Sequence, residues 1–142
     1  MELGANISMS QNKTDYKQPD SEGNIVVYEN TPLSFSPDIV GSANVRVFPV
    51  KNFEIHWQAK YVGKQYLDNT GNEHLALDPY LVNDARIAYL ATGKRIPDIE
   101  ISLMVNNVFN VLYESNGAVY GDTPYYFPQA GINFMAGLIM KF

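Results

Sequence analysis

Hydrophobic and polar residues alternate along most of this chain with a period of two. The clearest case runs from Lys51 to Tyr66, where one face is apolar and the other is charged or amide-bearing. The apolar face holds Phe53, Ile55, Trp57, Ala59 and Tyr61, and the polar face holds Glu54, His56, Gln58, Lys60 and Lys64. Successive side chains of a strand point to opposite faces of a sheet, so this pattern predicts a strand with one apolar side.

The same alternation recurs in five further segments. They are residues 2–10, 39–48, 80–90, 99–105 and 132–142. One exception stands out, because Asn83 falls on the apolar face of its segment. No segment shows convincing helical spacing. The chain is therefore predicted to be all-β, an antiparallel up-and-down meander of about six strands.

The connections between these segments alternate strictly between long and short. The long ones are residues 11–36, 67–79 and 114–130, and the short ones are residues 48–51 and 92–97. Alternate connections of an up-and-down sheet lie at the same end. All long loops are therefore predicted at one end of the sheet, and all short turns at the other.

Two architectures fit strands with one apolar side. A soluble β-barrel or β-sandwich that binds an apolar ligand would turn Phe53, Ile55 and Trp57 inwards, whereas a membrane barrel would turn them towards lipid. Strands of about 10 residues, loops of unequal length at the two ends and aromatic residues near strand ends favour the membrane barrel. The soluble architecture remains the alternative.

Composition narrows the function further. The 142 residues suit one domain, and Lys+Arg 10 against Asp+Glu 15 gives a net charge of -5 with no basic run, which argues against nucleic acid. Cys 0 and His 2 remove disulfides and leave few metal ligands. The apolar stretch Phe134–Met140 is much shorter than the roughly 18 residues of a membrane helix. The first residues lack the basic start and apolar core of a secretory signal.

Several motifs in the second half of the chain occur in a specific order. Val-Asn-Asn-Val-Phe-Asn-Val-Leu-Tyr at residues 105–113 is followed by Tyr-Tyr-Phe-Pro-Gln-Ala at 125–130 and by a closing strand that ends in Phe142. This order resembles the C-terminal end of TonB-dependent outer-membrane receptors. Residues 61–70 and 77–80 are similar to receptors of Bacteroidetes type, whereas Gly131 stands where the family often has a basic residue.

The resemblance implies a large outer-membrane β-barrel of roughly 22 strands with an N-terminal plug. Residues 1–142 would supply its last six strands, so we expect a truncated segment without plug or upstream strands that does not transport alone. The implied function of the intact receptor is TonB-dependent nutrient uptake, with siderophore-iron favoured. The implied partners are outer-membrane lipid, the rest of the barrel and its plug, TonB, and the barrel assembly machinery. No cofactor is implied.

The last strand is a candidate signal for barrel assembly. Its alternate apolar side chains are Phe134, Ala136, Leu138, Met140 and Phe142. An exposed edge strand of this kind can be recognised by strand addition. The simpler interpretation is an ordinary lipid-facing strand, and both can hold.

Charged residues on the polar faces are candidates for the lumen wall, where they could contact plug or substrate. They are Arg46, Glu54, His56, Lys60, Asp84, Arg86 and Glu100. The simpler interpretation is a set of cross-strand ion pairs, each contributing less than about 1 kcal/mol.

The long loops hold two further candidates. Asp68, Glu73, His74 and Asp78 could bind a hard cation, although such residues more often form turns. Tyr120, Tyr125, Tyr126 and Phe127 could form an aromatic surface for a ligand, or pack as an interfacial girdle. No catalytic motif is present, so we expect no enzyme.

Overall fold

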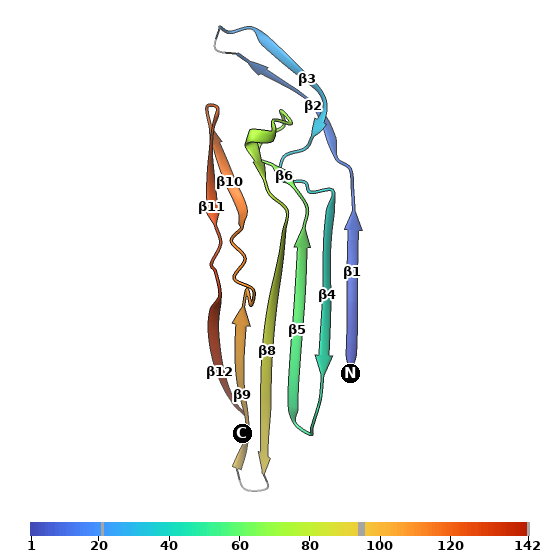
Figure 1. Cartoon of the computed structure of the whole chain (residues 1–142), viewed down its shortest axis with the longest axis vertical. Helices are drawn as coiled ribbons and strands as arrows, with labels where there is room; N and C mark the ends of the chain where they lie inside the picture. The colour runs from blue at the N-terminus through green and yellow to red at the C-terminus, as the bar shows by residue number, and fades with distance from the viewer. Residues whose placement is uncertain (21, 94–95, 142) are drawn as a thin grey trace.

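The computed structural model describes residues 1–20, 22–93 and 96–141, and its fold is all-β. Six strands form one antiparallel sheet in the order β1-β4-β5-β8-β9-β12, so consecutive strands of the meander pair with each other. The strands are β1 (Glu2–Met9), β4 (Ile39–Val47), β5 (Phe53–Val62), β8 (Tyr80–Gly93), β9 (Ile96–Asn106) and β12 (Asn133–Lys141). The predicted six-stranded meander is confirmed (Figure 1).

The connections separate to the two ends of the sheet as predicted (Figure 1). In the β4–β5 turn, the N–H of Phe53 donates to the carbonyl of Val50 at 3.2 Å. Asn52 in this turn has a φ of 65°, a left-handed conformation that Asn tolerates better than most residues. Lys94 and Arg95 of the predicted turn 92–97 lie outside the described residues.

The long connections, predicted as loops, contain secondary structure of their own. They contain three two-stranded sheets and one 3-10 turn, η1. Their elements are β2 (Lys13–Pro19), β3 (Ile25–Pro32), β6 (Gln65–Tyr66), η1 (Glu73–Leu75), β7 (Ala76–Leu77), β10 (Glu114–Tyr120) and β11 (Thr123–Pro128). These strands are short and their apolar residues are adjacent rather than alternating, as in Ile25–Tyr28 of β3 and Tyr125–Phe127 of β11, so the alternation that predicts the main sheet is weak in them.

Strand register assembles the apolar positions into rows that cross the whole sheet. One row consists of Leu3, Val45, Trp57, Ala85, Val105 and Phe134. Its members lie on an open surface, where Trp57 is 36% and Phe134 66% exposed. The described residues place no second layer over this face.

The tightest apolar packing lies at the long-loop end, away from the centre of the sheet. Leu67, Leu75 and Leu77 form a buried cluster, and Val119 of β10 packs against it. This cluster fastens the β10–β11 hairpin to the loop between β5 and β8. Within the described ranges, no helix is long and apolar enough to cross a membrane.

Candidate functional site

Charged side chains on the polar face form one ladder across five strands. Arg46 of β4 lies 3.3 Å from Glu2 of β1 and 3.5 Å from Glu54 of β5, measured between guanidinium nitrogen and carboxylate oxygen. Arg86 of β8 lies 3.3 Å from the same oxygen of Glu54 and also pairs with Glu100 of β9. Acidic and basic groups therefore alternate from β1 to β9.

Glu54 is the central residue of this ladder, because its Oε1 atom faces both guanidinium groups. The Nε atom of Arg46 is buried and forms no hydrogen bond, so its 3.5 Å contact with Glu54 is an ion pair without hydrogen-bond geometry. Partly exposed pairs of this kind contribute less than about 1 kcal/mol each. The ladder is a row of cross-strand ion pairs in which neighbouring charges compensate each other.

Three other predicted lumen residues lie on the same face and outside the ladder. His56 lies between the two arginines of the ladder on neighbouring strands. Lys60 is exposed near the long-loop end of β5. The Oδ1 atom of Asp84 accepts the backbone N–H of Asn107 at 2.8 Å, so this carboxylate fixes the end of β9. All seven candidate residues lie on the polar face, and four of them, Arg46, Glu54, Arg86 and Glu100, form ion pairs within the described part of the chain.

Asn107 is a buried polar residue whose role the hydrophobic pattern does not predict. Its side-chain NH₂ donates to the carbonyls of Val111 (2.8 Å) and Ala130 (3.2 Å), and its Oδ1 accepts the N–H of Val111 (2.8 Å). The next residue, Val108, donates its N–H to the carbonyl of Asn83 at 2.8 Å. Asn83 is buried, at 4% exposed, and its backbone carbonyl joins β8 to this turn.

Two of the four residues considered as a cation site in the loop 67–79, Asp68 and Glu73, accept hydrogen bonds from neighbouring side chains. Glu73 accepts hydrogen bonds from the Lys64 ammonium and from the Tyr66 hydroxyl. Asp68 accepts from the N–H and the hydroxyl of Thr70. Among the described residues, no three His, Asp or Glu side chains are grouped as metal ligands. Turn chemistry accounts for this loop.

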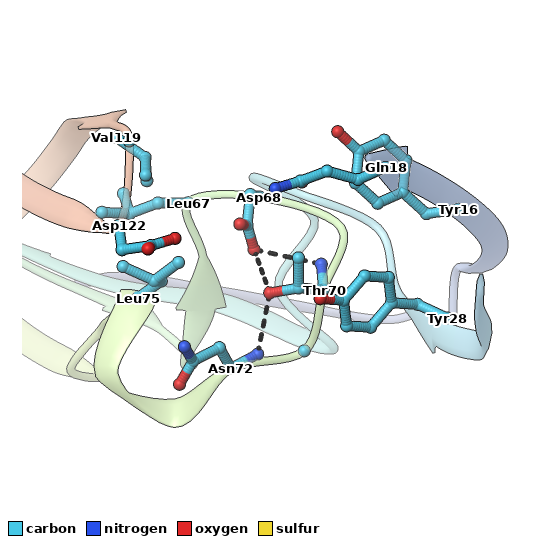
Figure 2. A pocket seen from close by; sticks show the side chains of 12 residues that line it. Tyr16, Gln18, Tyr28, Leu67, Asp68, Thr70, Asn72, Leu75, Val119 and Asp122 are labelled. Carbon is cyan, nitrogen blue, oxygen red and sulfur yellow. Dashed lines mark hydrogen bonds between the residues drawn. The ribbon is translucent and has the colours of Figure 1, made fainter. Parts of the chain in front are cut away.

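A cavity of about 610 Å³ lies where the three long connections meet (Figure 2). The β2–β3 hairpin contributes Tyr16, Gln18 and Tyr28. The loop after β6 contributes Leu67, Asp68, Thr70, Gly71, Asn72 and Leu75, and the β10–β11 hairpin contributes Val119, Gly121 and Asp122. Its volume is within the range of small-molecule sites, roughly 300–1,000 Å³.

Hydrogen bonds within the loop organise one wall of this cavity, as Figure 2 shows. The Oδ1 atom of Asp68 accepts the N–H and the hydroxyl of Thr70 at 3.0 and 2.7 Å, and the Thr70 hydroxyl accepts the N–H of Asn72 at 3.3 Å. The rings of Tyr16 and Tyr28, from the β2–β3 hairpin, lie 6.2 Å apart between centroids. The cavity therefore combines carboxylates, amides, a hydroxyl and phenol rings.

The predicted loop aromatics do not line this cavity. Tyr120 is 82% exposed, and Tyr126 donates its hydroxyl to the carbonyl of His74 at 3.1 Å, so it fastens the β10–β11 hairpin to η1. Tyr125 and Phe127 are exposed on β11. The aromatic residues that line the cavity are instead Tyr16 and Tyr28. The alternation of half-buried Thr14, Tyr16 and Gln18 could have indicated a strand here, but only one of the three is aromatic.

The predicted assembly strand is the edge of the sheet. Phe134, Ala136, Leu138 and Met140 share one exposed face of β12, whose partner among the described residues is β9. Phe142 lies outside the described residues. The other face of β12 also carries exposed Met135 and Ile139, so this strand is apolar on both sides.

Comparison with solved structures identifies proteins with this fold. The siderophore receptor PiuA from Acinetobacter baumannii has a TM-score of 0.76 and 16% sequence identity over 96% of this chain and 19% of that chain. The ferric-catecholate import receptor Fiu from E. coli K12, in its closed form, has a TM-score of 0.69 and 15% identity over 95% of this chain and 18% of its own. The ferric citrate transporter FecA has a TM-score of 0.65 and 17% identity over 82% and 19%.

At these identities the likeness establishes the fold alone. The chain spans about a fifth of the length of each of these receptors. No protein-family model matches the sequence. No curated protein matches it either. The fold is that of a segment of siderophore and ferric-complex receptors, whose names describe reception and import rather than catalysis.

Proposed function

We propose that this chain is the C-terminal barrel segment of a TonB-dependent outer-membrane receptor that takes up siderophore-bound iron. The observation that carries the proposal is the six-stranded sheet with an open apolar face, a charged ladder on the opposite face and three folded connections at one end. This combination accords with a barrel whose outside faces lipid and whose inside faces water.

The proposal assigns a partner to each surface. The apolar rows contact outer-membrane lipid, and the ladder around Glu54 faces the lumen and the plug. The free edges of β1 and β12 pair with the remaining barrel strands, because unpaired N–H and C=O groups are costly within a bilayer. β12 is the strand that the assembly machinery recognises. TonB acts on the intact receptor, and the sequence resemblance favours the Bacteroidetes type.

Residues 1–142 then form the last strands of a larger barrel rather than an independent transporter. We expect the coding sequence upstream of Met1 to continue into further alternating strands and a plug. An upstream stop codon followed by a separate promoter would contradict this domain assignment.

Trp57, the one Trp of the chain, tests the membrane assignment directly. It lies on the apolar face of β5, so its fluorescence should be strongly quenched when the chain is reconstituted in bilayers with brominated acyl chains. The matched control moves the indole to the opposite face, with Trp57→Phe combined with Gln58→Trp. This variant should be quenched much less, because side chains at successive positions face opposite sides.

Equal, weak quenching of both proteins would overturn the proposal. It would favour the alternative of a small soluble barrel that closes with Trp57 inside. In that case Trp57 should also be shielded from an aqueous quencher such as iodide without any lipid present.

A further inference from the structure

We propose that the cavity among the three long connections binds a positively charged iron chelate of the hydroxamate type and disfavours anionic catecholate and citrate chelates. This inference rests on the proposed function, since it names the substrate class of that receptor. The juxtaposition of Asp68, Asp122, Tyr16 and Tyr28 in one cavity carries it.

The charged groups of the cavity lining are both carboxylates. Asp68 belongs to the loop after β6 and Asp122 to the tip of the β10–β11 hairpin, and the lining includes no Lys, Arg or His. Thr70 donates twice to Oδ1 of Asp68, whereas Oδ2 has no hydrogen bond among the described residues. An anion in this cavity would face two like charges without a compensating cation, and a cation would be attracted by both.

The neutral part of the lining also suits a cationic chelate with carbonyl and amide groups. The rings of Tyr16 and Tyr28 can hold a cation over their faces, and their hydroxyls can donate to carbonyl oxygens. Gln18 and Asn72 can donate to and accept from amide groups of the ligand. Leu67 and Val119 provide an apolar surface for its methylene chains.

The surrounding loop end has the same sign of charge as the cavity. Residues 10–38, 63–79 and 107–132 contain 3 Lys against 10 Asp and Glu, a net charge of -7, whereas the whole chain carries -5. The remaining residues, which form the sheet and its short turns, therefore carry a net charge of +2. Charge of one sign around an open site raises the association rate of oppositely charged ligands and slows that of like-charged ones.

The distinction matters because the named neighbours import ferric catecholate and ferric citrate. Iron(III) complexes of catecholates and citrate are anions, whereas a tris-hydroxamate complex with a free ammonium group is a cation. The common fold does not set this preference, because the loops at the open end supply the ligand contacts. The acidic cavity predicts a substrate of opposite charge to those two.

The test is isothermal titration calorimetry on the full chain in lipid nanodiscs. The probes are a ferric tris-hydroxamate that carries a free ammonium group, a ferric tris-catecholate and ferric citrate. We expect the cationic hydroxamate to bind saturably. The two anions should bind at least about tenfold more weakly, because their interactions with Asp68 and Asp122 are repulsive rather than attractive. Affinity for the cation should fall as salt is raised.

Two variants connect this binding to the cavity. Asp68→Asn keeps an oxygen that can accept from Thr70, and Asp122→Asn changes an exposed loop-tip residue, so both should fold. Each should weaken binding of the cationic chelate about fivefold, as expected for one partly screened charge contact. Glu29→Gln is the matched control, because it removes one exposed negative charge from the same loop end outside the cavity lining. Its effect should stay within about twofold.

The outcomes separate this inference from the proposed function. Tighter binding of the catecholate or citrate, no binding of any chelate, or equal effects of Asp122→Asn and Glu29→Gln would each overturn the inference. These results would leave the proposed function intact wherever Trp57 is quenched by brominated lipid in the same nanodiscs. Loss of that quenching contradicts the proposed function itself.

Discussion

Asn107 lies directly after β9 with a φ of 51°, and its side chain makes three hydrogen bonds to backbone groups while only 3% of the residue is exposed. Asn enters the left-handed region more readily than most residues and offers both a donor and an acceptor. It therefore reverses the chain and connects the turn to Val111 and Ala130. Its sequence neighbours suggested a family motif, but not this role.

Asn107→Ala should lower the free energy of unfolding by about 3 kcal/mol, because buried backbone groups lose their partners and Ala is strained at positive φ. Urea unfolding in detergent micelles, followed by Trp57 fluorescence, measures this change. Asn110→Ala is the control, since Asn110 also has a φ of 51° but is exposed and makes one side-chain bond, to the N–H of Ile132. Its smaller loss should be about 1–2 kcal/mol. Equal losses of unfolding free energy in the two variants would contradict the role of Asn107 in connecting this turn.

Glu73 makes the loop between β5 and β8 sensitive to pH. Hydrogen bonds from Lys64 and then from Tyr66 lower the pKa of Glu73 below its usual value of 4.5. The bond to Glu73 also raises the pKa of Lys64 and the pKa of Tyr66 above their usual 10.5 and 10.0. The hydrogen bonds from Lys64 and Tyr66 to Glu73 persist only while the carboxylate is charged and both partners keep their protons.

The contribution of Glu73 should be complete above pH 4.5 and lost as the pH falls through its lowered pKa. The contributions of Lys64 and Tyr66 should be complete below their usual pKa values and lost as the pH rises through the raised ones. Amide hydrogen exchange of residues 73–77, corrected for intrinsic rates, should show protection between these limits. Glu73→Gln should abolish the acid-side change, and an unchanged profile would contradict the arrangement.

At the scale of elements, the β10–β11 hairpin packs against the loop after β6 at a glycine. A Cβ on Gly117 would lie 2.8 Å from the carbonyl oxygen of Tyr125 and 3.0 Å from a methyl carbon of Leu67. Because the first contact is with backbone, the hairpin cannot accept a side chain here without moving. Gly117 thus brings Val119 close to the leucine cluster that forms one end of the cavity.

Gly117→Ala should destabilise the packed hairpin by about 1–3 kcal/mol through overpacking. Proteolysis at the hairpin tip should become faster, and mass spectrometry of the fragments would locate the cut. Gly41→Ala on β4 is the control, because its closest contact would be 3.5 Å from the carbonyl oxygen of Asn6, an ordinary distance. A hairpin as resistant in Gly117→Ala as in Gly41→Ala would disprove the close-packing argument.

The main strands could be predicted because each carries a hydrophobic face, whereas the hairpins could not. β2 is mostly polar, and β3 carries its apolar residues as the consecutive run Ile25–Tyr28, so neither strand of this pair shows a hydrophobic face with a period of two. The ends of two strands also differ from the prediction. β8 continues to Gly93, beyond the predicted end at residue 90, and β9 starts at Ile96, before the predicted start at residue 99. Residues of these hairpins line the cavity, so the cavity could not be predicted from the sequence either.

At the scale of the whole molecule, the two faces of the sheet differ in what they can contact. Apolar rows remain open on one side, and the ladder centred on Glu54 crosses the other. Under the proposed function, a bilayer would penalise charge on the first face, while water would accept it on the second. The difference between faces is therefore a measurable property of the sheet.

A lysine introduced on each face should separate the two environments. Ile87→Lys, in the apolar row with Ile55 and Leu103, should weaken folding into bilayers by about 2–4 kcal/mol. Gln58→Lys on the polar face of β5 lies opposite Asp84 and should change it by less than about 1 kcal/mol. Urea titration of the chain folded into lipid vesicles measures both. Equal costs would argue against a one-sided membrane sheet.

The sequence by itself determined which residues share a face, which connections are long, and that the fold is an all-β meander, because a period of two is a local property of the chain. Only the tertiary structure decided which charges meet. Glu2, Arg46, Glu54, Arg86 and Glu100 become a ladder through the register of five strands, and register follows from many pairings at once. The cavity likewise joins Tyr16 to Asp122 because folded connections, distant in sequence, converge at one end of the sheet.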